Sequence, residues 1–379
     1  MASRDISQDH ASRKILWLRM PQQRSVVAAH LRHVAGRFRA AGWWVAWGAG
    51  ESIEPGCTLA VMDDPWVEAL PEVAGALARA EADDECWRVP RINGVDPPQG
   101  WRAETGPYTA RDYELQALDG GASTRAVSPG AQPWCGFAVA APEDVEHLLA
   151  AGWPPEPSAV RLVTGVRLYR YQDPAAHGRE ELDPYLPDDA TTLVDVGCGH
   201  GLLGERHRRP GRRVIGIEPD WHLAAVASRR LDLVLAATAE EGLAALRPGV
   251  DCIVFADVLE HLVDPRAALA AAARVLADGG CIVTSLPNAA WAPVVRALAA
   301  GRWDPTLAGV QARDHLALMT PASFRRQAAE CGLRVAHEEA MIAPLSWRQR
   351  LFAWIAATLA GGRPKDLLTT QWIAVLERS

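Results

Sequence analysis

The chain has 379 residues, of which 49% are hydrophobic and 22% are charged, and its formal net charge is −7. This composition is typical of a globular protein with about two domains, and because neither half is basic it argues against a nucleic-acid partner. The seven cysteines form no Cys-x-x-Cys pair, which favours reduced thiols over a disulfide framework or a zinc site. With no signal peptide and no apolar run long enough to span a bilayer, we expect a cytoplasmic protein without a membrane span.

The first part of the chain alternates apolar segments with helical patterns. We predict strands at 15–18, 43–47, 58–62 and 134–139, helices at 25–41, 67–80 and 143–151, and a turn-rich region at 90–132. This order predicts a smaller α/β or α+β domain. The proline-rich segment 153–157 is the predicted linker. We therefore expect an N-terminal accessory domain at 1–157 and a second domain at 158–379.

Two features of the accessory domain have alternative interpretations. Asp63 and Asp64 end a predicted strand, in a segment that faintly resembles family-2 glycosyltransferases, where adjacent carboxylates hold a divalent cation on a sugar nucleotide. The same pair also suits an acidic turn that caps the helix expected from Val67. Nine of the 15 tryptophans precede residue 160. They either fill the core or form an acceptor-recognition surface by stacking on sugar rings and cations.

The second domain alternates strands and helices almost to its end. Strands are predicted at 193–196, 214–217, 233–236, 251–255, 281–285, 334–338 and 371–377, and helices at 221–231, 239–246, 265–276, 293–300 and 321–331. Repeated units of this kind predict a doubly wound, mostly parallel, Rossmann-like sheet. Ligands of such sheets bind beyond the carboxyl ends of the strands. Asp195, Glu218, Asp257 and Asn288 lie at or just beyond those ends.

A glycine-rich turn follows the first strand of this domain. Gly197, Gly199 and Gly201 alternate there, and glycine lets a ligand lie against the main chain. Residues 199–204 also satisfy the dinucleotide pattern G-x-G-x-x-G. However, Asp195 precedes the glycines, and its charge would repel a pyrophosphate. It suits a ligand that carries ammonium and sulfonium groups, such as S-adenosylmethionine (SAM).

Five sequence blocks, at 193–201, 216–218, 255–265, 276–280 and 285–288, resemble the class I SAM-dependent methyltransferases. The resemblance covers about residues 160–379, and it is closest to the bacterial branch of ubiquinone-pathway O-methyltransferases and glycan-cluster enzymes. It implies a seven-stranded methyltransferase sheet with SAM as the cofactor. The SAM-binding residues that it implies are Asp195, Gly197, Cys198, Gly199, Gly201, Glu218, Pro219, Thr238, Ala239, Asp257 and Val258. Thr238 is a departure, since the family often has an acid there, near the adenine.

Two histidines are candidates for the base that removes a proton from an acceptor hydroxyl, a task that suits histidine near neutral pH. His261 follows Asp257, and His315 lies in a segment that this branch commonly places over the pocket. A purely local role in the turn is the alternative for His261. Another is that Glu260 and His261 bind a divalent metal, although we assign no metal ligand.

The sequence therefore predicts methyl transfer from SAM to a hydroxyl of a sugar, a glycan-pathway intermediate or a natural-product small molecule. The alternatives are a bifunctional protein with a reduced glycosyltransferase-like N-terminal domain, and a non-catalytic scaffold with the SAM fold. One further segment, 347–359, carries apolar and basic residues on a predicted helix. It either packs as a lid or makes weak peripheral contact with a membrane or a lipid-linked acceptor.

Overall fold

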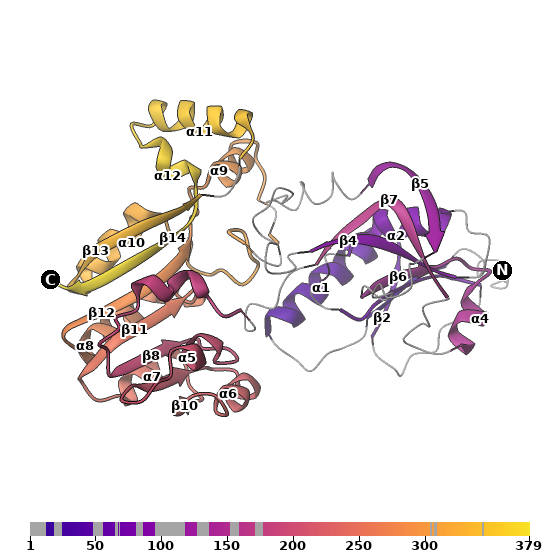
Figure 1. Cartoon of the computed structure of the whole chain (residues 1–379). Coiled ribbons are helices and arrows are strands. Elements are labelled where there is room, and N and C mark those ends of the chain that lie inside the picture. The colour runs from indigo at the N-terminus through magenta and orange to yellow at the C-terminus, as the bar shows by residue number, and fades with distance from the viewer. Residues whose placement is uncertain are drawn as a thin grey trace, which may run out of the picture. The chain divides into compact units, whose positions relative to one another are not determined.

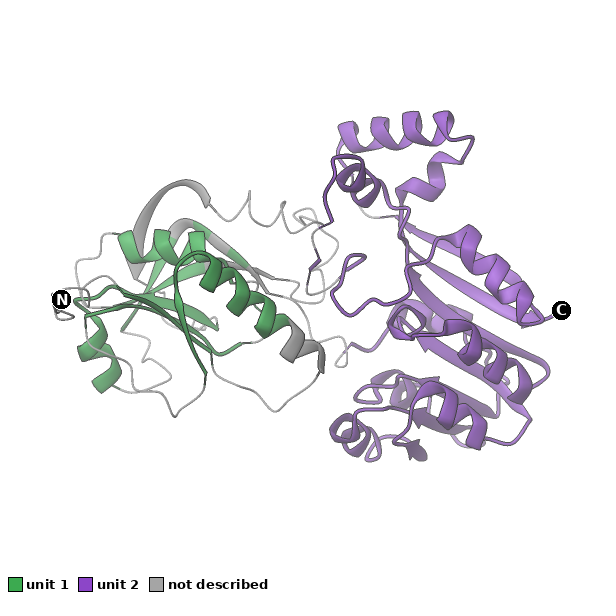
Figure 2. Cartoon of the chain, turned by 180° about the vertical axis from the view of Figure 1, so that it is seen from behind, with its two compact units in different colours: residues 1–101, 105–171 green, residues 102–104, 172–379 purple. Residues whose placement is uncertain are grey.

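The computed structural model divides the chain into two compact units, residues 1–101 with 105–171, and residues 102–104 with 172–379 (Figure 2). The residues that the structure describes are 13–18, 25–47, 56–64, 67, 69–80, 86–94, 118–126, 136–151, 159–170, 177–303, 305–306, 309–342 and 345–379. The predicted linker at 153–157 lies outside them. Among the described residues, no helix has the length and hydrophobicity of a bilayer-spanning segment.

The first unit contains a seven-stranded sheet with the order β2-β1-β3-β6-β4-β7-β5. Its elements are β1 (Lys14–Leu18), α1 (Ser25–Ala40), β2 (Trp44–Trp47), β3 (Thr58–Met62), α2 (Pro71–Arg79), β4 (Trp87–Gly94), β5 (Leu118–Ala126), β6 (Phe137–Ala140), α4 (Val145–Ala150) and β7 (Val160–Arg170). The first three strands are parallel to one another, and β6 is antiparallel to both of its neighbours. This unit is the α/β domain expected ahead of the second one.

Two strands of the first unit replace parts of the predicted turn-rich region, namely β4 and β5. The unpredicted β7 pairs with both of them. Because β7 completes this sheet, the division between the units falls after Tyr171, whereas the sequence placed it after residue 157. Helix α2 begins at Pro71 and not at Val67, because proline is well suited to the first helical turn.

The Asp63–Asp64 pair follows β3 but does not cap α2, whose N-cap residue is Leu70. The backbone N–H groups of Asp63 and Asp64 both donate to the carbonyl oxygen of Gly136, at 3.1 and 3.4 Å. The acidic-turn interpretation as a helix cap is therefore wrong, and the cation-binding interpretation stays a prediction. Trp43 and Trp87 are buried, as core filling predicts, whereas Trp44 is 65% exposed. A role of the tryptophans in acceptor recognition stays a prediction.

The second unit contains a seven-stranded sheet with the order β10-β9-β8-β11-β12-β14-β13 (Figure 1). Its strands are β8 (Thr192–Val196), β9 (Arg213–Ile217), β10 (Leu233–Leu235), β11 (Val250–Ala256), β12 (Leu276–Pro287), β13 (Leu333–Ile342) and β14 (Thr369–Arg378). Only β14 is antiparallel to its neighbours, and the other adjacent pairs are parallel. The predicted mostly parallel sheet is confirmed.

The helices of the second unit follow the predicted order with small shifts at their ends. They are η5 (Glu180–Tyr185), α5 (Leu202–Arg206), α6 (Trp221–Ala227), α7 (Ala239–Ala245), η6 (Leu259–His261), α8 (Pro265–Val275), α9 (Ala292–Ala299), α10 (Pro321–Glu330), α11 (Trp347–Leu359) and α12 (Pro364–Leu368). Four of them, α8, α9, α10 and α12, begin with a proline in the first turn. Both short 3-10 helices, η5 and η6, contribute to the site described below.

The core of the second unit occupies both faces of its sheet. Along β11, Ile253 and Phe255 belong to one buried cluster, whereas Cys252 and Val254 belong to another. Successive side chains of a strand point to opposite faces, so a strand that is apolar throughout must be covered on both sides. This burial fixes the register of the sheet, and it brings the carboxyl ends of β8, β9, β11 and β12 to one edge.

Candidate active site

The glycine turn between β8 and α5 lies at this edge and has a conformation that requires glycine. Gly197, Gly199 and Gly201 have φ values of 69°, 54° and 78°, which L side chains rarely adopt. A Cβ atom on Gly197 would lie 2.6 Å from Cγ2 of Val258. The turn therefore packs directly against the segment that follows β11, and both predicted elements of the site are in contact.

Glu218, at the end of β9, is hydrogen-bonded to the glycine turn. Its Oε2 atom accepts a hydrogen bond from the Gly199 N–H at 2.9 Å, and its Oε1 atom accepts one from the Asp220 N–H at 3.0 Å. These hydrogen bonds fix the orientation of Glu218 against the glycine turn, and its predicted contact with a ligand diol stays a prediction.

Asp195 lies within β8 and is only 2% exposed. Burial, together with the nearby charge of Glu218, raises the pKa of Asp195 to about 7, although Arg179 and Arg206 oppose the shift. Two acids placed this close favour a cationic ligand group, because a positive charge would relieve their repulsion. This agrees with the charge argument from the sequence.

Asp257 follows β11, and its carboxylate contacts three other side chains of the site. Its Oδ1 atom accepts hydrogen bonds from Ser285 Oγ at 2.7 Å and from Gln371 Nε2 at 2.5 Å. Its Oδ2 atom forms an ion pair with the guanidinium of Arg179. Burial alone would raise the pKa of Asp257, but Arg179 and these hydrogen bonds hold it below its usual value.

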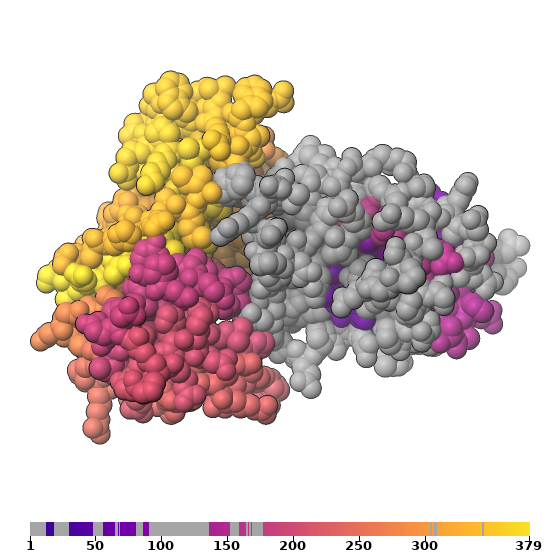
Figure 3. Space-filling model, in the orientation of Figure 1, coloured from indigo at the N-terminus to yellow at the C-terminus, as the bar shows by residue number. Residues whose placement is uncertain are grey.

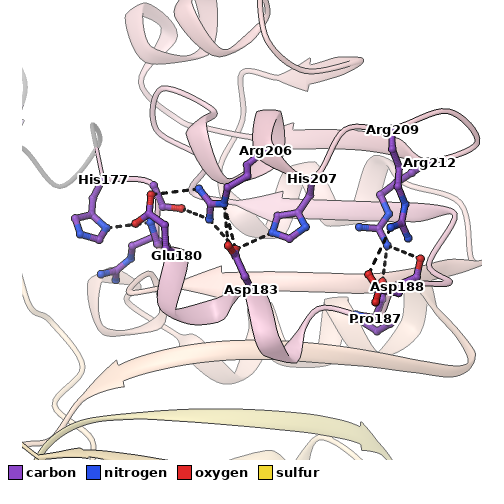
Figure 4. A network of polar contacts seen from close by, with 11 residues as sticks. His177, Glu180, Asp183, Pro187, Asp188, Arg206, His207, Arg209 and Arg212 are labelled. Atoms are coloured by element: carbon purple, nitrogen blue, oxygen red, sulfur yellow. Dashed lines mark hydrogen bonds and ion pairs between the residues drawn. The ribbon is translucent and has the colours of Figure 1, made fainter. Parts of the chain in front are cut away.

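Arg179 is the residue of the site that the sequence analysis missed. The segment that carries it is fastened to α5, since the Asp183 carboxylate accepts hydrogen bonds from Arg206 at 2.7 Å and contacts His207 at 2.8 Å (Figure 4). Arg206 also donates to the carbonyl oxygen of Gly178 at 2.7 Å. These contacts hold the chain next to Arg179 in place. No spacing or periodicity marks this arginine in the sequence, because it precedes the first strand of the sheet.

The other predicted cofactor residues follow the carboxyl ends of β8, β9, β10 and β11. Val258 contacts the glycine turn, Ala239 is buried, and Pro219 is exposed. Cys198 is buried, and burial raises the pKa of its thiol well above the usual value. The Thr238 hydroxyl caps α7 by accepting a hydrogen bond from the Glu241 N–H at 3.3 Å. Adenine contacts by Thr238 and Ala239 stay predictions.

Asn288 has a structural role, although it lies at the same edge. Its side chain is fully buried, and its Nδ2 group donates to the carbonyl oxygens of Asp366 at 2.6 Å and Thr369 at 2.7 Å. Its Oδ1 atom accepts a hydrogen bond from the Ala290 N–H at 3.0 Å. Asn288 therefore joins the end of β12 to α12 and to the first residue of β14.

The two predicted catalytic histidines lie together. The ring centroids of His261 and His315 are 4.9 Å apart. The Nδ1 atom of His261 lies 3.2 Å from the carbonyl oxygen of Asp314 and 3.3 Å from its carboxylate, while the Nδ1 atom of His315 lies 3.1 Å from the carbonyl oxygen of Val310. His261 and His315, which are more than fifty positions apart in the sequence, thus form one cluster. From the sequence they were predicted only as two independent candidates.

The members of this cluster have opposite pKa shifts. Burial opposes a charge on His261, but the hydrogen bond and charge of Asp314, with Glu260, raise its pKa to about 9. Burial and the charge of His261 lower the pKa of His315 to about 4. Burial and the charge of Asp257 raise the pKa of Glu260 to about 8. At neutral pH His261 is therefore protonated and positively charged, whereas His315 is neutral.

Glu260, His261 and His315 also have the composition of a metal site. One ligand atom from each lies within 4.8 Å of the others. The Oε2 atom of Glu260 is buried without a hydrogen-bond partner among the described residues. The metal alternative raised by the sequence thus has suitable donors, and it competes with a metal-free role for the same histidines.

The charges at this edge fit SAM group by group. Carboxylates at Asp195 and Asp257 suit an ammonium group, the Arg179 guanidinium suits a carboxylate, and Glu218 suits a ribose diol. Gly197, Gly199 and Gly201 have no side chain that would separate their own backbone from such a ligand.

The fold is that of a Rossmann-like α/β protein, a class whose ligands bind at the carboxyl edge of the sheet. Residues 167–338 match the family model described as "Methyltransferase domain". Ubiquinone biosynthesis O-methyltransferases of Cereibacter sphaeroides are relatives: one from strain KD131 is 29% identical over 191 residues, 49% of this chain and 77% of the relative. Another, from strain ATCC 17025, is 30% identical over 180 residues, 46% of this chain and 72% of the relative.

The C-terminal half of the chain belongs to the class I SAM-dependent methyltransferases, and its methyl donor is SAM. Among solved structures, a SAM-dependent methyltransferase from Archaeoglobus fulgidus has a TM-score of 0.40 at 16% identity, covering 52% of this chain and 91% of that one. The resemblance seen in the sequence is confirmed, and the protein is a methyltransferase.

Proposed function

We propose that the protein transfers the methyl group of SAM to a hydroxyl oxygen, and that His315 accepts the proton of that hydroxyl. Bound SAM supplies a methyl group made electrophilic by its sulfonium. The observation that supports this proposal most directly is the contact between His315 Nδ1 and the Val310 carbonyl. A carbonyl oxygen only accepts, so the ring proton of neutral His315 lies on Nδ1, and the Nε2 lone pair is free to act as a base.

The remaining charged residues have complementary roles in the proposal. His261 and Asp314 form an ion pair that orients the segment carrying His315. Arg179 and Asp257 bind the carboxylate and ammonium groups of the methionine end, and Glu218 binds the ribose. Aligning the acceptor with the methyl group then supplies most of the remaining rate enhancement.

The chemistry of the base favours an acidic acceptor. His315, with a pKa of about 4, is a weak base and needs an acceptor that gives up its proton readily. A phenol ionises near pH 10, as tyrosine does. An alcohol is much less acidic and resembles water, whose pKa is about 15.7. The relatives are O-methyltransferases by name, which supports oxygen as the methylated atom. We therefore propose a phenolic hydroxyl of a small molecule ahead of a sugar hydroxyl.

Mass spectrometry of matched acceptors tests this proposal. The protein is incubated with SAM and with paired phenolic, catecholic and sugar substrates, and products that gain one methyl group are identified. We expect methylation of a phenolic oxygen and a large loss of turnover in His315→Asn. The control variant, His337→Asn, should keep the turnover of the wild type, because His337 is exposed on β13. Methylation of nitrogen, or full turnover in His315→Asn, would contradict the proposal.

A further inference from the structure

Helix α11 exposes its large apolar side chains and buries its small ones. The buried positions are Ala353 and Ala357, at 0% and 1% exposure. The exposed positions and their exposed fractions are Trp347 69%, Leu351 48%, Trp354 58%, Ile355 43% and Leu359 84%. A helix that only packed as a lid would turn its large apolar residues inward. The apolar face of α11 is therefore available for something outside the second unit.

The five exposed residues form one continuous stripe. They follow one another at intervals of four, three, one and four positions, which is the spacing of a single helix face. The opposite, alanine-bearing face lies toward α9 and α12. In Figure 1, α11 lies above those helices, and in Figure 3 yellow atoms of the C-terminal part of the chain form the top of that unit. We call these five residues the apolar stripe.

The segment around the apolar stripe is cationic, although the whole chain carries a net charge of −7. Between residues 345 and 365 the sequence has four basic residues and no acidic one. Arg348 stacks on the Trp347 ring, with its guanidinium carbon 5.4 Å from the ring centroid. In the part of the chain that the structure describes, no carboxylate pairs with Arg348, Arg350 or Lys365. The positive charge around the stripe is thus available to an anionic partner.

We infer that the apolar stripe docks on the surface of an anionic lipid bilayer. Tryptophan is favoured at the boundary between headgroups and acyl chains, and basic residues beside it attract anionic lipids. A second copy of the chain is a poorer partner, because a two-fold interface on this helix would bring two cationic segments together. Charge complementarity therefore selects the lipid surface.

The topology places this surface at the catalytic edge of the sheet. Strand β13 is antiparallel to β14, which is antiparallel to β12, so β13 ends at the same edge as β12, and α11 follows it. Asn288, just beyond β12, is hydrogen-bonded to the carbonyl oxygens of Asp366 and Thr369. Gln371 of β14 donates to Asp257. A protein docked through α11 would therefore hold this edge of the sheet near the lipid, as an acceptor partitioned into a membrane requires.

Vesicle co-sedimentation of the full chain, without SAM or acceptor, tests the inference independently of the proposed function. The vesicles contain phosphatidylcholine alone, or with about one-third phosphatidylglycerol. One variant, Leu351→Gln with Trp354→Gln, removes the apolar contacts, and another, Arg348→Glu with Lys365→Glu, reverses the charge. Trp44→Gln is the matched control, because Trp44 is 65% exposed but lies in the first unit. Circular dichroism and thermal melting establish that each variant is folded.

The expected result is sedimentation with the anionic vesicles that weakens with added salt. Each stripe variant should lose binding by about tenfold or more, whereas Trp44→Gln should bind as the wild type does. No sedimentation of the wild type, or equal binding to both kinds of vesicle, would overturn the inference. It would also be overturned if the folded stripe variants bound vesicles normally but changed a dimer into a monomer by light scattering.

Discussion

Arg179 and Asp257 form an ion pair, and both have a left-handed backbone conformation. Their φ values are 58° and 52°, and they are the two non-glycine residues with positive φ in the described part of the chain. Such conformations cost about 1–3 kcal/mol each and persist where the surrounding contacts enforce them. The strain coincides with the two charges that match the zwitterionic end of SAM, which supports a binding role for the pair.

Replacing Arg179 should weaken SAM binding. Hydrogen bonds to charged groups are worth about 1.5–3 kcal/mol, so Arg179→Gln should raise the Kd for SAM roughly 10- to 100-fold in calorimetry. Arg266→Gln is the matched control, since Arg266 is an exposed arginine that pairs with Glu330 at 3.1 Å. A Kd in Arg179→Gln equal to that of the wild type would rule out the role that we assign to this residue.

The sequence predicted which strand ends and which turn meet at one edge of the sheet, because local rules determine them. Apolar strands, a glycine turn and an acid at the end of the second strand follow from burial and backbone geometry, and Gly197 and Glu218 lie as expected. Arg179 was not predictable, because its partner lies on another element and only the folded chain brings them together. Asn288 was placed at the correct edge, but its amide joins β12 to the chain before β14, which strand ends alone do not reveal.

The first unit was harder to predict for a related reason. Strands β4 and β5 contain proline, glycine and charged residues, so they resemble turns, yet both pair with β7. Their pairing partners follow much later in the sequence, and no local pattern indicates them. The boundary between the units moved for the same reason, because β7 belongs to the earlier sheet.

A methyl group on Gly197 should disrupt the site by steric contact as well as by backbone strain. Gly197→Ala introduces a Cβ atom 2.6 Å from Val258 Cγ2 at a φ of 69°, so we expect a loss of SAM affinity and about 2 kcal/mol or more of stability. Gly279→Ala is the control, because Gly279 has a φ of 78° but no atom within 4 Å of its added Cβ. Calorimetry and urea unfolding compare the two variants. Similar losses in both would mean that contact with Val258 is unimportant.

The ion pair of His261 and Asp314 should make stability depend on pH. The folded pKa of His261 is about 9, above its usual value of 6.5, so its stabilisation is complete below pH 6.5 and is lost as the pH rises through 9. The side chain is 36% exposed, so solvent screening reduces the effect to about 1–2 kcal/mol. Urea unfolding at pH 6 and pH 9.5 should show this loss in the wild type.

His261→Gln isolates this contribution from other groups that titrate in the same range. Glu260 and Asp195 also have raised pKa values, and they too lower stability as the pH rises. The difference in unfolding free energy between the two pH values should therefore shrink, but not vanish, in His261→Gln. An unchanged difference would show that His261 is not held in its charged form.

Chelation of metals and substitution of His315 together decide how the histidine cluster works. If His315 is the base, treatment with EDTA leaves the rate of methyl transfer unchanged, and His315→Asn lowers kcat by about a hundredfold or more with little change in the Kd for SAM. Because the pKa of His315 is about 4, the wild-type rate should not fall through protonation of this base until the pH approaches that value. If EDTA instead abolished activity and a divalent cation restored it, Glu260, His261 and His315 would act as metal ligands. A metal ion would bind the lone pairs of both rings and pair with the buried Glu260 oxygen.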